Sequence, residues 1–352
     1  MATFLYVILA LFVFGLLVMI HELGHFLMAR AFGVGIEEFS IGMGPKLFSK
    51  KGKKHDTVYS LRALPIGGYV SMVGEDEESD RPDAFHNKKV WQRILIVIAG
   101  PLMNLLLGFL LMLVVVLTTI HPATGRISLA STTIASFQEG ATSPSYGLQQ
   151  NDVITHVNGT RVHTGDELVY EIMNQGYEPI DLTVRRGEEK IVLQDVIFPG
   201  QSVEGIAFGN YDFLVYAEQV SFGTVMKHTF FRSVSMVKMI FDQLGDLLTG
   251  RFGLNAVSGP IGVTEELGNA AAKGANVFLR LVVLLTVNLG VFNLLPIPAL
   301  DGGRLLFLLV ELVWRRPIDK NVEGYIHFAG IMILFGLMIL ISCKDIAGLF
   351  AR

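Results

Sequence analysis

Four long apolar runs limit the folds that this chain can adopt. They cover residues 4–26, 94–117, 277–295 and 324–343. A helix needs about 20 apolar residues to cross a bilayer, where only helices and closed barrels pair all their backbone groups. Hydrophobic residues make up 51% of the 352 residues and charged residues only 17%, which is typical of membrane proteins. We therefore predict a polytopic α-helical membrane protein with about four transmembrane helices.

We expect the first run to be a transmembrane helix and not a cleaved signal peptide. It lacks a basic segment before it and a small-residue cleavage site, and its apolar character continues to Ala31. The single cysteine, Cys343, excludes an internal disulfide and a cysteine-based metal site. The net charge of −4 argues against nucleic acid as a partner.

Basic residues predict how the chain is oriented in the membrane. Nine lysines and arginines lie between residues 46 and 89, and four lie between 304 and 320. Loops rich in such residues face the cytoplasm. Both termini and the long segment 120–276 would then lie on the outer side.

The first run contains the sequence His21-Glu22-Leu23-Gly24-His25. Residues four apart share a face of a helix, so His21 and His25 can bind one metal ion. Glu22 can then act as the general base that takes a proton from the attacking water. Ionisable side chains in a membrane span cost on the order of 3 kcal/mol and are usually functional. The alternative is that neighbouring helices satisfy two paired histidines without a metal.

A metal bound by two histidines needs at least one further protein ligand. No third ligand follows the histidines closely, and the candidate is Asp301 in the stretch 293–303, NLLPIPALDGG. Asp301 is expected at the cytoplasmic end of the third run, at the same depth as the histidines. The prolines and glycines there break the helix and free backbone groups that need polar partners. A plain turn between two helices is the alternative.

Together these motifs resemble the bacterial site-2 protease family. The resemblance spreads over nearly the whole chain and includes three further stretches, SIGMGP at 40–45, GPLMN at 100–104 and SGPIG at 258–262. It implies an intramembrane zinc metalloprotease. His21, His25 and Asp301 would bind Zn²⁺, Glu22 would be the catalytic base, and Asn293 would help to hold the substrate strand.

The resemblance also implies partners and a location. The substrates would be single-span membrane proteins, cut within the lipid bilayer and often after a first protease has acted. Anti-sigma factors in regulated intramembrane proteolysis and signal-peptide remnants are both compatible with the family. The protein would be a multi-pass protein of the bacterial cell membrane, with its active site near the cytoplasmic side.

The segment 58–73 has a strand-like pattern interrupted by Pro65-Ile66-Gly67-Gly68. A transmembrane substrate must unwind before it is cut, and an exposed strand edge can pair with the freed backbone. We therefore expect Ile66 and Tyr69 to contact substrate in a small cytoplasmic or membrane-associated β element. The stretch 42–45 would form a re-entrant loop over the metal. An ordinary cytoplasmic hairpin is the alternative.

The outer segment predicts a separate, inserted α+β domain. Residues 143–159 look like the central stretch of a bacterial PDZ domain. Asn158-Gly159 predicts a hairpin turn, residues 164–174 have helical spacing, and a second hairpin is expected around Arg186-Gly187. Such a domain would bind a peptide ligand by strand addition or would act as a size filter that rejects bulky substrates.

Three other features of the chain bear on its fold and its site. Residues 220–248 have the pattern of an amphipathic helix at the membrane surface, with a soluble core helix as the alternative. Asn104 in the second run either supports the metal site or joins two helices. His327, near the start of the fourth run, could approach the metal.

These observations divide the chain into seven segments. They are a first transmembrane helix with the metal motif (1–31), a cytoplasmic or re-entrant β region (32–89), a second transmembrane helix (90–120), a PDZ domain (121–200), a tether with an interfacial helix (201–276), a third transmembrane helix with the Asp-Gly motif (277–304), and a cytoplasmic-side helix with the fourth transmembrane helix (305–352). A membrane scaffold would not need Glu22. An ion transporter would be expected to show repeated halves, and none is visible in the sequence.

Overall fold

The chain forms two compact units. The computed structural model describes residues 2–53, 56–75, 79–120, 125, 127–203, 206–251, 253 and 257–350. The first unit comprises Met1–Leu110 and Gly253–Arg352, and the second comprises Leu111–Phe252. Helix α2 (Val90–Thr118) runs from the first unit into the second.

Four helices are long and apolar enough to cross a membrane. They lie at Phe4–Ala31 in α1, Val90–Thr118 in α2, Ala275–Leu294 in α6 and Asn321–Gly348 in α8. These helices match the four apolar runs, so the prediction of about four helices with the length and composition of membrane spans is confirmed. Many large apolar side chains on α1 and α8 are exposed, among them Phe4, Phe12 and Ile333. Such a surface suits contact with lipid rather than with water.

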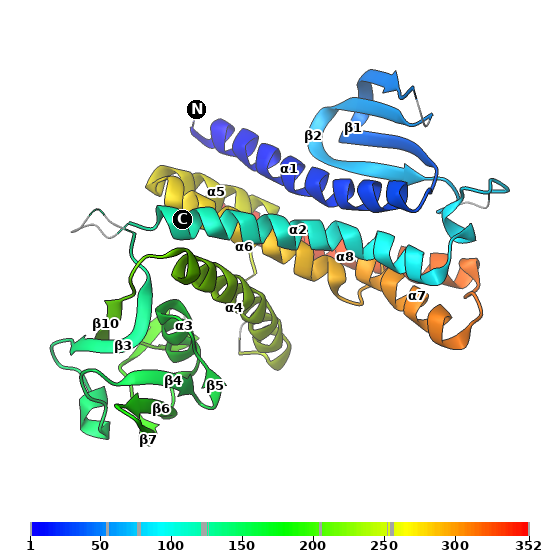
Figure 1. Ribbon diagram of the computed structural model, residues 1–352. Coiled ribbons are helices and arrows are strands. Elements are labelled where there is room, and N and C mark those ends of the chain that lie inside the picture. The colour runs from blue at the N-terminus through cyan, green and yellow to red at the C-terminus, as the bar shows by residue number, and fades with distance from the viewer. Residues whose placement is uncertain are drawn as a thin grey trace. The chain divides into compact units, whose positions relative to one another are not determined.

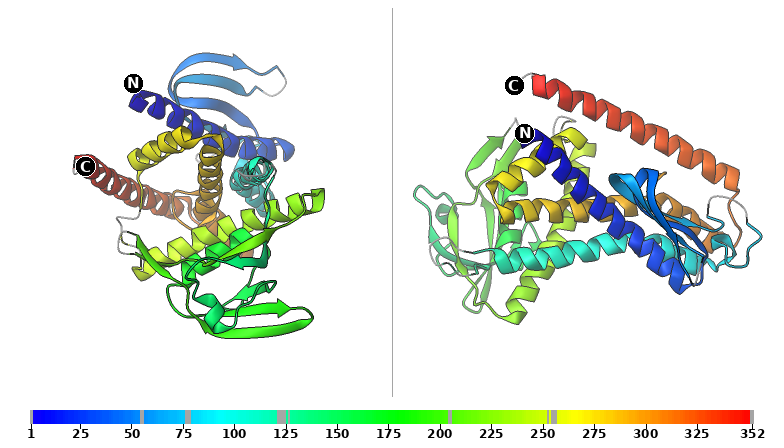
Figure 2. Two further views of the ribbon diagram at one scale, coloured as in Figure 1. Left: turned by 90° about the vertical axis from the view of Figure 1, so that its left-hand side faces the viewer. Right: turned by 90° about the horizontal axis from the view of Figure 1, so that it is seen from above.

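Two long strands form the β element of the first unit. Strands β1 (Ile36–Lys51) and β2 (Val58–Met72) bend, so that Ser40 is paired both with Tyr69 and with Ser60. The stretch 68–72 therefore has β1 on one edge, while its other edge faces α1 (Figures 1 and 2).

The stretch 42–45 is not a loop, contrary to the sequence-based prediction, because it continues strand β1. Gly42 and Gly44 have φ angles of +82° and +83°, which only glycine adopts readily. Their positive φ angles let the strand bend without ending. The sequence pattern was misread because two glycines and a proline usually mark a loop.

Strand β2 lies along the helix that carries the metal motif. A Cβ atom at Gly15 of α1 (Ala2–Ala31) would come within 2.5 Å of the Pro65 carbonyl oxygen, so helix and strand touch through their backbones. One turn further along α1, Val18 packs against Gly67. The close approach fixes β2 beside the helix face that leads to Glu22.

The third spanning helix ends before the Asp-Gly motif. Helix α6 (Ala275–Leu294) stops ahead of the two prolines, and Asp301 begins a new helix, α7 (Asp301–Trp314). The expected third helix through residue 304 is therefore corrected to two helices joined by a turn. Proline has no backbone N–H group to donate a helical hydrogen bond, which explains why α6 ends before Pro296.

Helix α5 (Pro260–Lys273) starts at the SGPIG stretch and is capped by α8 (Lys320–Phe350). The Asp345 carboxylate accepts hydrogen bonds from the backbone N–H groups of Gly259 and Gly262, at 2.9 and 3.0 Å. A carboxylate at a helix N-terminus satisfies unpaired donors and interacts favourably with the helix dipole. The two glycines leave room for this side chain, which explains their presence in the motif.

Replacing Asp345 by alanine should destabilise the first unit by about 2 kcal/mol, because two buried charge-assisted hydrogen bonds are lost. Thermal unfolding of the detergent-solubilised protein would measure this loss. Asp345→Asn keeps one acceptor and should lose less. An alanine variant that unfolds at the wild-type temperature would show that the cap does not stabilise α5.

The second unit is built on one sheet with the strand order β10-β3-β4-β6-β7, and β5 pairs with β4. The strands are β3 (Ala130–Phe137), β4 (Val153–Val157), β5 (Thr160–Arg161), β6 (Ile180–Arg186), β7 (Glu189–Val196) and β10 (Phe213–Ala217). A short hairpin of β8 (Gly200–Val203) and β9 (Ile206–Gly209) precedes β10. A 3-10 turn, η2 (Ser143–Tyr146), also lies in this unit, whereas η1 (Phe85–Asn87) lies in the first unit. The core of the unit includes Ile134, Leu168 and Phe213.

Both predicted hairpins and the predicted helix of this unit are present. Asn158 and Gly159 have positive φ angles between β4 and β5, and β6 pairs with β7. Helix α3 (Gly165–Gln175) begins at a capping box made by Thr164 and Glu167. The predicted domain ended at residue 200, but strand β10 (Phe213–Ala217) also belongs to its sheet. The sequence did not indicate this, because β10 pairs with the distant strand β3.

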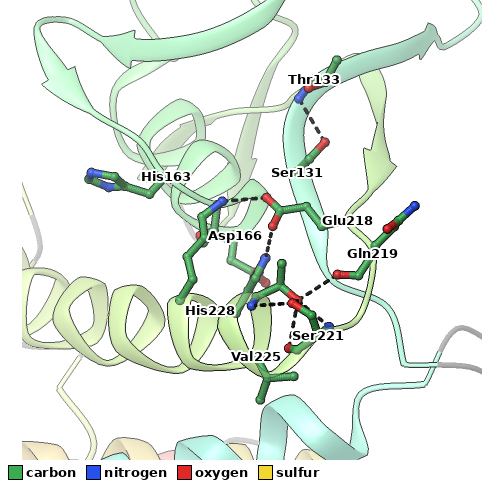
Figure 3. Close-up of polar contacts among 12 residues, drawn as sticks. Ser131, Thr133, His163, Asp166, Glu218, Gln219, Ser221, Val225 and His228 are labelled. Atoms are coloured by element: carbon green, nitrogen blue, oxygen red, sulfur yellow. Dashed lines mark hydrogen bonds and ion pairs between the residues drawn. The ribbon is translucent and has the colours of Figure 1, made fainter.

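Helix α4 (Phe222–Thr249) confirms the helix predicted for residues 220–248. Figure 3 shows its start, where the Glu218 carboxylate pairs with Lys227 at 2.7 Å and lies 3.5 Å from the fully buried His228. Arg232 pairs with Asp166 of α3 at 2.6 Å. Burial and the nearby Arg232 guanidinium lower the pKa of His228. These ion pairs attach α4 to the sheet domain within the second unit.

Candidate metal centre

The side chains of His21, His25 and Asp301 converge at one point of the first unit. The Nε2 atoms of His21 and His25 lie 2.9 and 3.2 Å from Asp301 Oδ2, and they are 3.2 Å apart. Both histidines are buried, each with 7% of its surface exposed. Within the described ranges, these three residues form the group that could hold a metal ion.

The local sequence explains this convergence. The histidines are four residues apart on α1, so one turn separates them on the same face. Asp301 is brought to them by the turn before α7, where any side chain at Gly302 or Gly303 would collide with carbonyl oxygens of the turn. His327 Nδ1 accepts the Ala299 N–H at 2.9 Å. The structure therefore places His327 beside the turn that presents Asp301.

The three donor atoms fit a zinc ion. Asp301 Oδ2 is buried and receives no hydrogen bond among the described residues. His25 turns its Nδ1 atom away to the Ile96 carbonyl oxygen at 2.9 Å, which leaves the Nε2 lone pair for a metal. Ligand atoms about 2.1 Å from a tetrahedral zinc lie about 3.4 Å from one another. The observed separations are close to this value, and two imidazoles with one carboxylate leave a fourth position open for catalysis.

Glu22 lies next to the first histidine and is held by β2. Its Oε2 atom accepts the backbone N–H of Val70 at 3.1 Å. The Val70 N–H is not part of the ladder with β1, since it points from the other edge of the strand. Glu22 is thus attached to the strand edge that faces α1. Sequence analysis did not identify Val70, because a backbone donor leaves no residue signature.

The sequence matches peptidase family M50 over residues 9–337. The chain belongs to this family. A relative from Clostridium acetobutylicum is 35% identical over 98% of both chains. The zinc metalloprotease RasP of Geobacillus kaustophilus is 31% identical, with 96% of this chain and 97% of RasP covered. The regulator of sigma-W protease RasP of Bacillus subtilis is 28% identical, with 98% and 99% covered.

This M50 peptidase is a zinc metalloprotease with four helices that are long and apolar enough to cross a membrane. The resemblance to site-2 proteases that the motifs predicted is therefore confirmed, as are the enzyme class and the metal.

The structure gives partners within the protein to two of the three residues predicted to bind substrate, Asn293 and Tyr69. The Asn293 amide donates to the Leu289 carbonyl of its own helix at 2.8 Å. The Tyr69 hydroxyl is bonded to Arg62, whose guanidinium also lies 5.1 Å from the centre of the Tyr69 ring. Ile66 lies in β2. The strand position of Tyr69 agrees with the expected β element, but the structure gives its side chain an intramolecular partner.

Helix α2 contributes three residues to the site, of which only Asn104 had a possible supporting role in the sequence-based interpretation. Ile96, Gly100 and Asn104 are spaced four apart and therefore share one face of the helix. A Cβ atom at Gly100 would lie only 2.2 Å from His25 Nε2, so this glycine makes room for the ring. The spacing of Gly100 and Asn104, identical to that of the two histidines, was the available signal.

Proposed function

We propose that this M50 peptidase hydrolyses peptide bonds within or near the transmembrane segments of single-span membrane proteins. One observation carries the proposal: His21, Glu22 and His25 lie on a helix that is long and apolar enough to span a membrane. A soluble substrate would not reach a site on such a helix without entering the membrane. Anti-sigma factors and signal-peptide remnants are the proposed substrate classes.

The residues have separate roles in the proposed reaction. His21, His25 and Asp301 would hold the zinc ion, which supplies a Lewis acid that polarises the scissile carbonyl and makes water easier to deprotonate. Glu22 takes the proton from the attacking water and delivers it to the leaving amine. Asn293 would contact the substrate backbone after its amide turns away from Leu289.

A reconstitution experiment tests this function. The purified protein is placed in vesicles with a single-span protein whose outer part has been trimmed, and cleavage is followed by mass spectrometry. We expect cuts inside or beside the apolar segment, and none after zinc chelation. Cleavage confined to soluble proteins would contradict the proposal.

The edge of β2 that faces α1 is the proposed docking place for the unwound substrate. An exposed strand edge replaces the hydrogen bonds that the substrate loses when its helix opens. In the structure this edge runs past Val18 and ends at the Val70–Glu22 hydrogen bond. The substrate strand would therefore lie beside the general base.

Val70→Pro should reduce cleavage at least about tenfold, because it removes the outward N–H beside Glu22 without removing a ladder bond. Zinc content should stay at the wild-type level. Initial rates on a single-span substrate measure the effect, and Val70→Ala, which keeps the N–H, serves as the matched control. Wild-type rates for the proline variant would refute a role for this edge.

We also propose an orientation, with the metal centre near the cytoplasmic side and the second unit outside. The basic residues between the first two spans support it. In a Cys343→Ser background, cysteines are introduced singly at the exposed positions Lys50 and Glu139. A membrane-impermeant maleimide should label only the Glu139→Cys protein in intact cells. The reverse labelling would overturn the orientation.

The second unit is proposed to be a PDZ domain. It offers a cavity of about 470 Å³ between α3 and the edge strand β10, lined by Ala130, Gly165, Asp166, Val169, Tyr211, Phe213, Leu214 and Val215. A peptide added to β10 would occupy this groove. Val169→Arg should fill the groove. A lower cleavage rate of the Val169→Arg variant would favour peptide binding. If a variant without the second unit cut substrates whose outer domains are intact, a size filter would be favoured.

Helix α4 is proposed to lie at the outer membrane surface. Its exposed apolar side chains include Phe222, Phe230 and Phe241, while Lys238 and Arg232 pair with acidic groups of the second unit. An amphipathic helix with such a face binds at the lipid boundary.

A further inference from the structure

The face of α2 that carries Ile96, Gly100 and Asn104 provides one polar partner for each of the two histidines. His25 Nδ1 bonds to the Ile96 carbonyl oxygen at 2.9 Å, and His21 Nδ1 lies 3.2 Å from the Asn104 side-chain amide. Each histidine therefore has its Nε2 atom toward Asp301 and its Nδ1 atom toward α2. The support for His25 is a backbone group, whereas that for His21 is a side chain.

Asn104 is fully buried, and its oxygen Oδ1 receives no hydrogen bond from the described residues. A buried amide oxygen without a donor costs free energy on the order of 1–3 kcal/mol. The atom that faces His21 is Nδ2, which is a donor. For His21 to offer its Nε2 lone pair to a metal, its proton must reside on Nδ1, and Nδ1 then needs an acceptor.

A half-turn of the amide resolves both problems at once. The two orientations of an asparagine amide fill the same volume, and the hydrogen-bond network decides between them. With Oδ1 toward His21, the Nδ1–H group finds an acceptor and the buried oxygen gains a donor, while Nδ2 moves to the place where Oδ1 had no partner among the described residues. The zinc-binding form of His21 therefore selects one orientation of Asn104.

We propose that Asn104 is a positioning residue that accepts a hydrogen bond from His21 Nδ1 and so fixes the ring with Nε2 toward the metal. This inference rests on the proposed ligand set. Partners of this kind orient a ligating histidine, and their loss typically lowers metal affinity about 10–100-fold. The GPLMN stretch thus serves both histidines: Gly100 leaves room for the His25 ring, and Asn104 orients the His21 ring.

A role in helix packing alone makes a different prediction. Thr286 of α6 is also fully buried, but its hydroxyl bonds to the Val282 carbonyl of its own helix at 2.6 Å and not to a histidine. Thr286→Val therefore removes a buried polar group of the bundle without touching the metal site. It is the matched control for Asn104→Leu, in which an apolar side chain of similar size replaces the amide.

The experiment measures the zinc dissociation constant by competition with a chelator. Asn104→Leu should bind zinc about 10–100-fold more weakly, Asn104→Asp, which keeps an acceptor, should stay near wild type, and Thr286→Val should not change. The melting temperatures of the proteins are also measured with and without zinc. A positioning role predicts that zinc raises the melting temperature of Asn104→Leu less than that of the wild type, while the metal-free proteins melt at the same temperature.

Zinc affinity of Asn104→Leu within twofold of wild type would overturn the proposal, as would an equal loss in Thr286→Val. Failure of the ligand set itself is distinguishable, because His21→Ala would then keep its zinc. Zinc retained by His21→Ala would thus reject the proposed ligand set, independently of the result for Asn104→Leu.

Discussion

Glu22→Gln should abolish cleavage while zinc remains bound. The glutamine keeps the size of the side chain and can still accept the Val70 N–H, but it cannot take a proton from water. General base catalysis contributes about 100- to 10,000-fold, so the rate should fall by at least the lower figure. Cleavage of a single-span substrate by the reconstituted protein and zinc per chain by elemental analysis are the two measurements.

The control for this substitution is Glu178→Gln, which makes the same chemical change on an exposed residue of the second unit. It should cut at the wild-type rate. If Glu22→Gln retained full activity, another residue would have to be the base. If it lost both activity and zinc, the side chain would serve the metal site rather than the proton transfer.

Asp301→Ala and His21→Ala should each lower zinc from near one ion per chain to a small fraction of that amount. Removing one of three protein ligands leaves only two, which do not hold a catalytic zinc firmly. The distances of 2.9 and 3.2 Å from Asp301 Oδ2 to the two histidines make it the proposed third ligand. Elemental analysis of the detergent-purified proteins needs no knowledge of the substrate.

Asp80→Ala is the matched control, because Asp80 is exposed and lies outside the metal cluster. Its zinc content should equal that of the wild type. Zinc retained in Asp301→Ala would mean that the third ligand lies elsewhere in the chain.

The sequence predicted the parts of this fold that local rules determine. Apolar runs predict spanning helices because the membrane leaves the backbone few alternatives. The pairing of His21 with His25 follows from helical spacing alone. Asp301 required a further step, the expected depth of the third run, and the structure agrees in bringing the carboxylate to the histidines.

Long-range pairing limited the rest of the prediction. The stretch 42–45 was misread as a loop because its glycines bend a strand whose partner lies elsewhere in the sequence. Asp301 was placed at the end of a spanning helix, whereas the structure starts a new helix there. The cap of α5 by Asp345 joins residues 83 and 86 positions apart, a contact that no periodicity predicts.

The predicted substrate residues illustrate a similar limit. A motif can indicate that Asn293 or Tyr69 is important, but the hydrogen-bond partner depends on the three-dimensional neighbours. The structure gives both side chains partners inside the protein, Leu289 and Arg62. Any role in substrate binding would require them to exchange these partners.

If substrate docks on the edge of β2 as proposed, the hydrogen bond from Val70 to Glu22 and one from Val70 to the substrate would exclude each other. A single amide proton cannot serve the carboxylate and an incoming strand fully at the same time. A substrate that pairs at Val70 would therefore release Glu22 at the moment its own backbone arrives. Until then Glu22 would stay hydrogen-bonded to β2, so the arrival of a substrate strand would change the surroundings of the proposed base.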